Sequence, residues 1–153
     1  MRSQRGNLKQ NKMSNSSDIK VVDLPRIEDP RGNLSFLQYP DHVPFPIERV
    51  YWVYDVPGGA ERQGHAFRTQ REMIIALSGA FDVVLDRGDG TEVRHHLSRS
   101  YCGVLVPPMT WRMLDNFSTN AVALVLSSTL YDASDYIIED YEDFIKLVNI
   151  GNH

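Results

Sequence analysis

Cysteine occurs only once in the 153-residue chain, at Cys102, so the protein cannot form an intramolecular disulfide or a metal site built on several thiolates. The chain also lacks any run of about 20 apolar residues, the length needed to span a bilayer. Its first residues are polar and lack the apolar core of a secretory signal. From these absences we expect a cytoplasmic protein with no membrane partner.

Positive charge is scarce after the first 17 residues. Four of the 16 Lys and Arg residues lie in residues 1–17, so 12 remain against 20 Asp and Glu residues, a net charge of −8. Because phosphate backbones are bound by clustered Lys and Arg, this balance argues against a nucleic-acid partner. The first segment is rich in Asn, Gln and Ser, which is typical of disorder. We therefore predict a disordered leader over residues 1–17 and a single domain over residues 18–153.

Turn residues divide the rest of the chain into short segments with the composition of β-strands. The predicted strands cover residues 19–24, 34–38, 48–56, 72–77, 80–85, 91–97, 101–106, 111–114 and 121–127, and a further strand opens at Gly64-His65. In the fifth of these segments Phe81, Val83 and Leu85 share one face, because side chains two residues apart in a strand point the same way. So many short strands favour a sandwich or a jelly roll.

The apolar period changes near the C-terminus. Apolar residues recur there at helical spacing, at Ile137, Tyr141, Phe144, Ile145 and Val148. This pattern predicts a terminal helix, for which Ser134 or Asp132 could act as the N-cap. The fold class predicted is therefore all-β with a short C-terminal α-helix.

His65 is the first candidate for chemistry. It follows a Gly-rich loop and opens a strand, so Phe67 should share its face, as should Thr69 and Arg71. An imidazole that faces the mouth of a jelly roll is suited to proton transfer near neutral pH. The alternative is a histidine at the surface or one bonded for structural reasons.

A metal site is not expected. A transition metal needs three or four nitrogen, oxygen or sulfur ligands. His95 and His96 are adjacent, so they point to opposite faces of one strand and cannot enter the same site. They follow a polar hairpin, and we expect both to be solvent-exposed.

Arginines are candidates for binding an anionic ligand, because a guanidinium binds phosphate oxygens bidentately. The candidates are Arg49, Arg62, Arg68, Arg71 and Arg112. Arg112 stands between Trp111 and Met113 in an apolar stretch, where an unpaired cation would be costly. Tyr51, Trp52 and Tyr54 are either sheet-face aromatics or a flat surface for a nucleotide base.

Six motifs follow one another along the chain. They are Asp29-x-Arg31-Gly32-x-Leu34, Ile47-x-Arg49-Val50-Tyr51-Trp52-Val53-Tyr54-Asp55, Arg62-x-Gly64-His65-Ala66, Leu77-x-Gly79, Val106-Pro107-Pro108-x-x-Trp111 and Tyr131-Asp132-x-x-Asp135-Tyr136-Ile137. In this order, from about Ile19 to Val148, they resemble the dTDP-4-oxo-6-deoxyglucose 3,4-ketoisomerases, the WxcM-like cupins of bacterial surface-polysaccharide pathways.

The resemblance implies a cupin double-stranded β-helix that needs neither metal nor cofactor and forms a homodimer with exchanged N-terminal strands. It also implies a dTDP-sugar in the barrel mouth, whose keto group moves from C4 to C3 through an enediol on the way to amino sugars of O-antigens. His65 would then be the general base, Glu72 or Tyr51 the acid, and Arg112 or Arg68 would stabilise the oxyanion. The substrate would be bound by Arg31, Arg49, Arg62, Arg68, Arg71, Trp111, Arg112 and Asp115.

Three positions depart from the family pattern. The usual His-Ala-His is His65-Ala66-Phe67 here, the usual Trp-His is Trp111-Arg112, and the usual Glu-Gln is Arg71-Glu72. Phenylalanine cannot transfer a proton, and loss of a positioned acid–base group typically costs about 10²–10⁴ in rate. Three functions therefore stay open: an active sugar-nucleotide isomerase or epimerase, a non-catalytic protein that binds a dTDP-sugar, and an enzyme for another small anion.

Overall fold

The structure, a computed structural model, describes residues 18–138 and 140–151. The predicted leader over residues 1–17 lies outside the described residues. The strands are β1 (Lys20–Asp23), β2 (Arg26–Ile27), β3 (Leu34–Ser35), β4 (Arg49–Val53), β5 (Arg62–Phe67), β6 (Glu72–Ser78), β7 (Phe81–Asp86), β8 (Glu92–Leu97), β9 (Cys102–Val106), β10 (Trp111–Asp115), β11 (Val122–Ser127) and β12 (Tyr136–Ile138). A 3₁₀ turn, η1 (Ala133–Asp135), precedes β12, and one α-helix, α1 (Tyr141–Ile150), ends the described chain.

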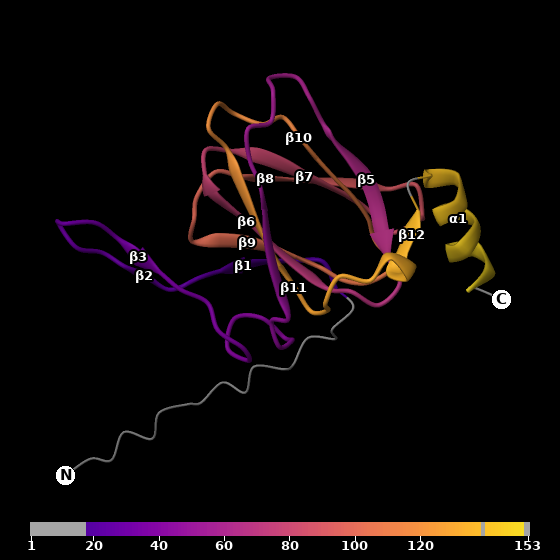
Figure 1. The fold of residues 1–153 in the computed structure, drawn as a ribbon, viewed down its shortest axis with the longest axis horizontal. Helices are drawn as coiled ribbons and strands as arrows, with labels where there is room; N and C mark the ends of the chain where they lie inside the picture. The colour runs from indigo at the N-terminus through magenta and orange to yellow at the C-terminus, as the bar shows by residue number, and fades with distance from the viewer. Residues whose placement is uncertain (1–17, 139, 152–153) are drawn as a thin grey trace, which may run out of the picture.

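Two antiparallel sheets form the barrel (Figure 1). The first has the strand order β1-β9-β6-β11-β4, and the second has the order β12-β5-β10-β7-β8. Most neighbours in each sheet are distant in sequence, which is the strand order of a jelly roll and confirms the predicted fold class. The two inner faces meet in one apolar core, to which Ile74, Val104 and Val125 contribute from the first sheet.

The strand β7 shows how the sequence pattern builds this core. Phe81, Val83 and Leu85 are fully buried in the core between the sheets, as their alternation predicts. Asp82 and Asp86 lie on the opposite face. Asp82 is hydrogen-bonded to both His96 and Arg94, and Asp86 accepts a hydrogen bond from Tyr141. The period of two therefore puts three apolar side chains in the core, while the opposite face carries Asp82 and Asp86 with Val84 between them.

A second apolar cluster covers part of the outer face of the first sheet. The loop between β3 and β4 brings Val43 and Phe45 onto Met73 and Leu105. This loop explains why β6 is buried on both faces in its first half, although a strand with one solvated face would alternate.

The short strands β2 and β3 form a hairpin that projects away from the barrel (Figure 1). The strand predicted over residues 34–38 is therefore only Leu34–Ser35. Gly32 lies in the connecting turn with φ of +134°, a conformation that side-chain-bearing residues rarely adopt.

The C-terminal helix exists but begins later than predicted. Its N-cap is Asp140, whose side chain accepts a hydrogen bond from the backbone N–H of Glu142 at 2.8 Å. Asp132 instead accepts from the backbone and hydroxyl of Ser134, ahead of η1. Ile137 lies in β12, which pairs with the edge of β5, so hydrogen bonding to an open sheet edge overrides the helical spacing here.

The helix packs against the outer face of the second sheet. Phe144 is fully buried against Ala66, and Trp111 completes this contact. No helix among the described residues combines the length and apolar character required to cross a bilayer.

Candidate active site

The inner face of the second sheet carries two polar groups next to each other. His65 on β5 is the cross-strand partner of Arg112 on β10, so their side chains share one face. Arg112 shares its face of β10 with Leu114, which lies in the core between the sheets. His65 therefore points toward the barrel interior, as expected of a residue that acts on a bound ligand.

Phe67 shares the face of His65, as the spacing predicts. The two rings meet edge to face, with centroids 4.9 Å apart and planes at 82°. The strand ends at Phe67, and the alternation does not continue beyond it. The guanidinium of Arg71 instead stacks at 5.9 Å over Phe45, in the apolar cluster outside the first sheet.

An ion pair joins the two sheets inside the barrel. Nε of Arg112 donates to Oε1 of Glu72 at 2.5 Å, and the two side chains are 5% and 1% exposed. Nη2 of Arg112 donates to the phenol oxygen of Tyr51 at 2.6 Å, and the phenol donates to Oε2 of Glu72. The cation that the sequence places in an apolar stretch thus finds its counterion on the opposite sheet.

Tyr51, Glu72 and Arg112, which we call the acid–base cluster, come from three strands. Tyr51 lies on β4, Glu72 opens β6, and β11 runs between these two strands in the first sheet. Arg112 reaches across from the second sheet. The structure therefore brings together both acids named from the sequence and one of the predicted arginines.

Gln70 extends the cluster toward Arg49. The amide nitrogen of Gln70 donates to Oε2 of Glu72 at 3.1 Å. The amide oxygen accepts from Nη2 of Arg49 at 3.0 Å and from the hydroxyl of Thr129 at 2.9 Å. Sequence reasoning missed Gln70, because a single glutamine between Thr69 and Arg71 carries no pattern that marks it as buried.

Arg49 is surrounded by aromatic rings. Its guanidinium lies 5.5 Å from the ring centre of Tyr51 and 5.7 Å from that of Tyr131. Its Nη1 is buried and has no hydrogen-bond acceptor within the part of the chain that the structure describes. A buried guanidinium nitrogen of this kind is suited to an anionic ligand.

Asp135 fixes the backbone beside this group. One carboxylate oxygen accepts from the backbone and hydroxyl of Thr69 at 2.9 and 3.1 Å, and the other accepts from the backbone of Gln70 at 3.1 Å. The carboxylate is buried, and no sequence argument assigned it a role although it lies in one of the motifs. Its partners are 65 and 66 residues away in sequence, so only the fold reveals the contact.

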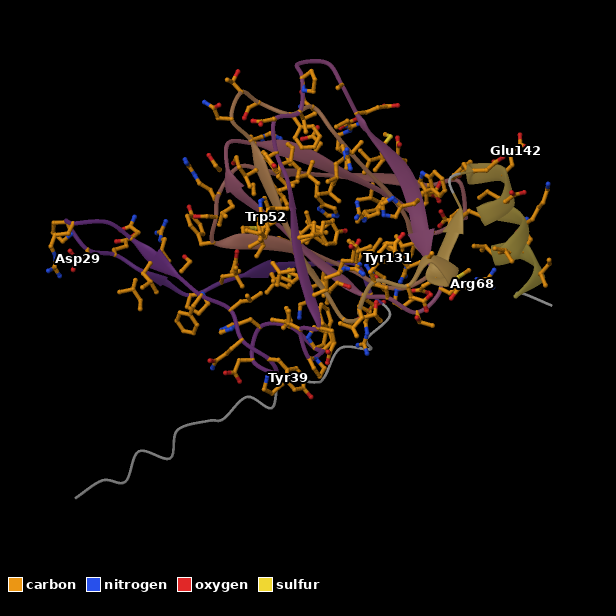
Figure 2. The ribbon with its side chains drawn as sticks, in the orientation of Figure 1. Asp29, Tyr39, Trp52, Arg68, Tyr131 and Glu142 are labelled. Atoms are coloured by element: carbon orange, nitrogen blue, oxygen red, sulfur yellow. The ribbon has the colours of Figure 1, made fainter. Side chains whose placement is uncertain are left out.

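Several predicted substrate-binding residues lie elsewhere. Arg31 is 90% exposed and paired with Asp29, which Figure 2 places at the tip of the β2–β3 hairpin, away from the barrel. The Arg31 guanidinium and backbone lower the pKa of Asp29 to about 2. Arg62 opens β5 and is exposed, and Arg68 is exposed just after the end of β5.

Trp111 and Asp115 lie on the outer face of β10. Trp111 packs against Phe144 and Tyr141 of α1, where it helps to dock the helix. Asp115 accepts two hydrogen bonds from Arg94 at 2.6 and 3.2 Å. Neither contact involves the acid–base cluster.

Polar groups also gather on this outer face, around Asp82. Burial alone would raise the pKa of Asp82, but the bonds from His96, Arg94 and Asn116 outweigh it and hold the pKa below its usual value. His96 is exposed, as expected, and bonds Asp82 at 2.6 Å. His95 lies on the opposite face and is half-buried, with Nε2 buried, so its expected exposure is wrong.

The described residues hold no group of three or more His, Cys, Asp or Glu side chains able to bind a metal ion.

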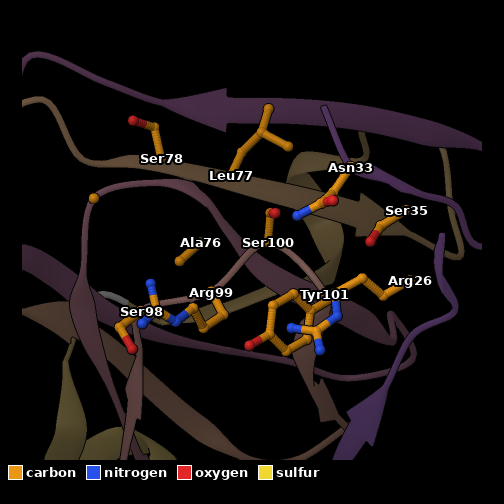
Figure 3. A pocket seen from close by; sticks show the side chains of 11 residues that line it. Arg26, Asn33, Ser35, Ala76, Leu77, Ser78, Ser98, Arg99, Ser100 and Tyr101 are labelled. Carbon is orange, nitrogen blue, oxygen red and sulfur yellow. The ribbon is translucent and has the colours of Figure 1, made fainter. Parts of the chain in front are cut away.

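A cavity of about 290 Å³ lies between the β2–β3 hairpin and the turns that follow β6 and β8 (Figure 3). Arg26, Arg99 and Tyr101 line it, whereas none of the acid–base cluster does. This cavity is therefore separate from the candidate site.

Comparison with known proteins points to one family. The family described as "FdtA: WxcM-like, C-terminal" matches residues 17–149. A TDP-4-oxo-6-deoxy-α-D-glucose-3,4-oxoisomerase from Aneurinibacillus thermoaerophilus is 34% identical over 130 residues, which cover 84% of this chain and 91% of the relative.

Solved structures agree. A 3,4-ketoisomerase from Helicobacter canadensis has a TM-score of 0.82 and 32% identity, over 86% of this chain and 98% of that one. The sugar 3,4-ketoisomerase QdtA from Thermoanaerobacterium thermosaccharolyticum, solved with TDP, has a TM-score of 0.82 and 28% identity, over 87% and 96% of the two chains.

Proposed function

This chain belongs to the FdtA, WxcM-like C-terminal family, and we propose that it is an isomerase that moves the keto group of a TDP-4-keto-6-deoxyhexose between C4 and C3. Relatives that are 32% and 34% identical carry the names 3,4-ketoisomerase and 3,4-oxoisomerase. The product would enter deoxysugar biosynthesis for surface polysaccharide. One observation supports the chemistry most: His65 lies across from Arg112 on the inner face, and Arg112 in turn bonds two further groups able to exchange protons.

The reaction needs four proton movements that cancel. A base removes the proton on C3, next to the C4 ketone, and the C4 oxygen gains a proton, which gives an enediol. The C3 hydroxyl then loses its proton while C4 gains one, so the ketone ends at C3. His65 is the proposed base, because a neutral imidazole accepts a proton near neutral pH.

The contacts divide the other roles. Glu72 accepts from Tyr51, Gln70 and Arg112, which is the bonding pattern of an ionised carboxylate. We therefore propose that Tyr51 exchanges protons with the sugar oxygens or with C4. Glu72 would hold the Tyr51 phenol in place through their hydrogen bond. The positive charge of Arg112 beside the phenol oxygen stabilises negative charge that develops there.

Substrate binding is proposed to centre on Arg49. Its buried Nη1 would bind a diphosphate oxygen. Arg62, Arg68 and Arg71 remain proposals as secondary contacts, and Trp111 and Asp115 as more distant ones, because both lie on the outer face of β10.

We also propose a homodimer with exchanged N-terminal strands, active in the cytoplasm. The β2–β3 hairpin exposes Ile27, Leu34 and Phe36, and the outer face of the first sheet exposes Trp52 and Leu77. Two copies could cover both apolar surfaces at once, and the hairpin would carry Arg31 toward the partner's barrel. Light scattering should give the mass of two chains, and the mass of one chain would refute the exchange.

The activity is tested with TDP-4-keto-6-deoxyglucose, the ligand named for one QdtA complex. We expect the protein to convert it to a 3-keto isomer, seen by NMR, and TDP to raise the melting temperature, because a ligand that binds only the folded state stabilises it. Stabilisation by TDP without conversion would favour a binding protein. The absence of both would favour an enzyme for another anion.

A further inference from the structure

Gln70 is the most connected polar residue beside the candidate site that the proposed chemistry does not use. It lies between β5 and β6 and is only 3% exposed. The chain on both sides is held, because Thr69 and Gln70 donate backbone hydrogen bonds to Asp135 and Arg71 donates one to the hydroxyl of Ser128 at 2.8 Å. The backbone that carries Gln70 is thus fixed by side chains from two other segments.

The orientation of its amide follows from its partners. Arg49 can only donate, so the group facing Arg49 must be the amide oxygen. The Glu72 carboxylate can only accept when ionised, so the group facing it must be the amide nitrogen. A flipped amide would face a donor with a donor and an acceptor with an acceptor. One orientation therefore satisfies both neighbours.

This orientation links two functions. On one side Gln70 holds Arg49, whose buried Nη1 has no acceptor among the residues described. On the other side it shares Oε2 of Glu72 with the phenol of Tyr51. Any change in how Gln70 donates to this oxygen alters how strongly the same oxygen accepts from Tyr51.

We propose that Gln70 is a positioning residue that couples the anion-binding guanidinium of Arg49 to the acid–base cluster of Tyr51, Glu72 and Arg112. The inference rests on the proposed function and deepens it. It assigns to Gln70 two tasks at once, the hold on Arg49 for the diphosphate and the hold on Glu72 for proton transfer. A glutamine that only satisfied buried polar groups would affect stability but not both of these properties.

The first test replaces the amide with an apolar group. Gln70→Leu removes the bonds to Arg49, Thr129 and Glu72, and we expect kcat to fall at least about tenfold and the dissociation constant for TDP to rise at least about threefold. Thr129→Val is the matched control, because it removes one donor to the same oxygen but touches neither Arg49 nor Glu72. Its kcat and TDP affinity should stay within about twofold of wild type.

The second test uses pH and also covers the case in which Gln70→Leu does not fold. Gln70→Glu keeps the shape of the side chain but places a second carboxyl group beside Glu72. In wild type the amide nitrogen of Gln70 lies at this position, 3.1 Å from Oε2 of Glu72. Two carboxylates so close cannot both ionise easily, and the protonated one can donate as the amide does. The activity of Gln70→Glu relative to wild type should therefore recover as the pH falls from about 8 to about 6.

The outcomes separate the inference from the function on which it rests. If wild type binds TDP but does not isomerise the sugar, the proposed reaction is wrong, and weaker TDP binding by Gln70→Leu than by Thr129→Val still supports the hold of Gln70 on Arg49. If wild type is active and Gln70→Leu retains its kcat and TDP affinity, the coupling is refuted. A relative activity of Gln70→Glu that does not change with pH would refute it as well.

Discussion

Arg112 and Glu72 form a buried ion pair that joins the two sheets of the barrel, with Nε and Oε1 2.5 Å apart. Taking two charges out of water costs free energy that their attraction only partly returns, so such a pair adds little net stability. Removing one partner is different, because it leaves the other charge buried alone.

We expect Arg112→Met to lower the free energy of unfolding by about 3–5 kcal/mol, as measured by urea denaturation. The double variant Arg112→Met with Glu72→Leu should recover most of that loss, because no charge stays unpaired. Lys146→Met is the control for an exposed pair, since the side chains of Lys146 and Asp143 are 71% and 56% exposed and the loss should cost about 1 kcal/mol or less. Equal losses in Arg112→Met and Lys146→Met would contradict the buried pair.

Gly64 makes room for Trp111, and hence for the helix. A Cβ atom at Gly64 would collide with the indole ring of Trp111. We expect Gly64→Ala to lower the free energy of unfolding by about 1–3 kcal/mol and to change the near-UV circular dichroism of the indole. Gly58→Ala meets nothing within 4 Å and should leave both measurements near wild type. If Gly64→Ala is as stable as Gly58→Ala, the close approach of strand and ring is wrong.

Tyr141 anchors the helix through its hydrogen bond to Asp86. This bond and burial raise the pKa of Tyr141 to about 12. Because the folded value lies above the unfolded value of about 10, the contribution to stability is complete below pH 10 and is lost as the pH rises toward 12. Tyr141→Phe should cost about 1–2 kcal/mol at pH 8, and its deficit relative to wild type should shrink above pH 10. A deficit that is constant with pH would contradict this linkage.

Asp82 should control the response to acid. Its pKa in the folded protein lies below the usual value. Its contribution to the free energy of unfolding is therefore present above about pH 4 and is lost as the pH falls through that lowered pKa. We expect the unfolding free energy of Asp82→Asn to vary less than that of wild type between about pH 5 and pH 2. The exposed Glu61, changed to Gln, serves as the control and should leave the wild-type slope unchanged. If the unfolding free energy of Asp82→Asn changed with pH as steeply as that of wild type, Asp82 would not control the loss of stability in acid.

Much of the fold could be predicted from local pattern. Alternation placed Phe81, Val83 and Leu85 in the core, and the same period put Phe67 beside His65. Helical spacing found α1 but extended it back to Ile137, because spacing alone does not register that an open edge of β5 needs a partner strand.

The site was only partly predictable, for a physical reason. The sequence marked Arg112 as a cation in need of a counterion, yet that counterion, Glu72, lies on another sheet and 40 residues away. Gln70 and Asp135 act through contacts that only the closed barrel creates. Motifs also do not reveal which face of β10 Trp111 occupies, and here that face meets the helix.

The role of His65 is most directly tested by proton exchange. In deuterated water, wild type should incorporate deuterium at C3 of TDP-4-keto-6-deoxyglucose faster than the uncatalysed reaction, as followed by NMR. We expect His65→Asn to slow this exchange by about 10²-fold or more, whereas His96→Asn, an exposed imidazole on the outer face, should match wild type. Exchange by His65→Asn at the wild-type rate would contradict the account, because some other group would then remove the proton.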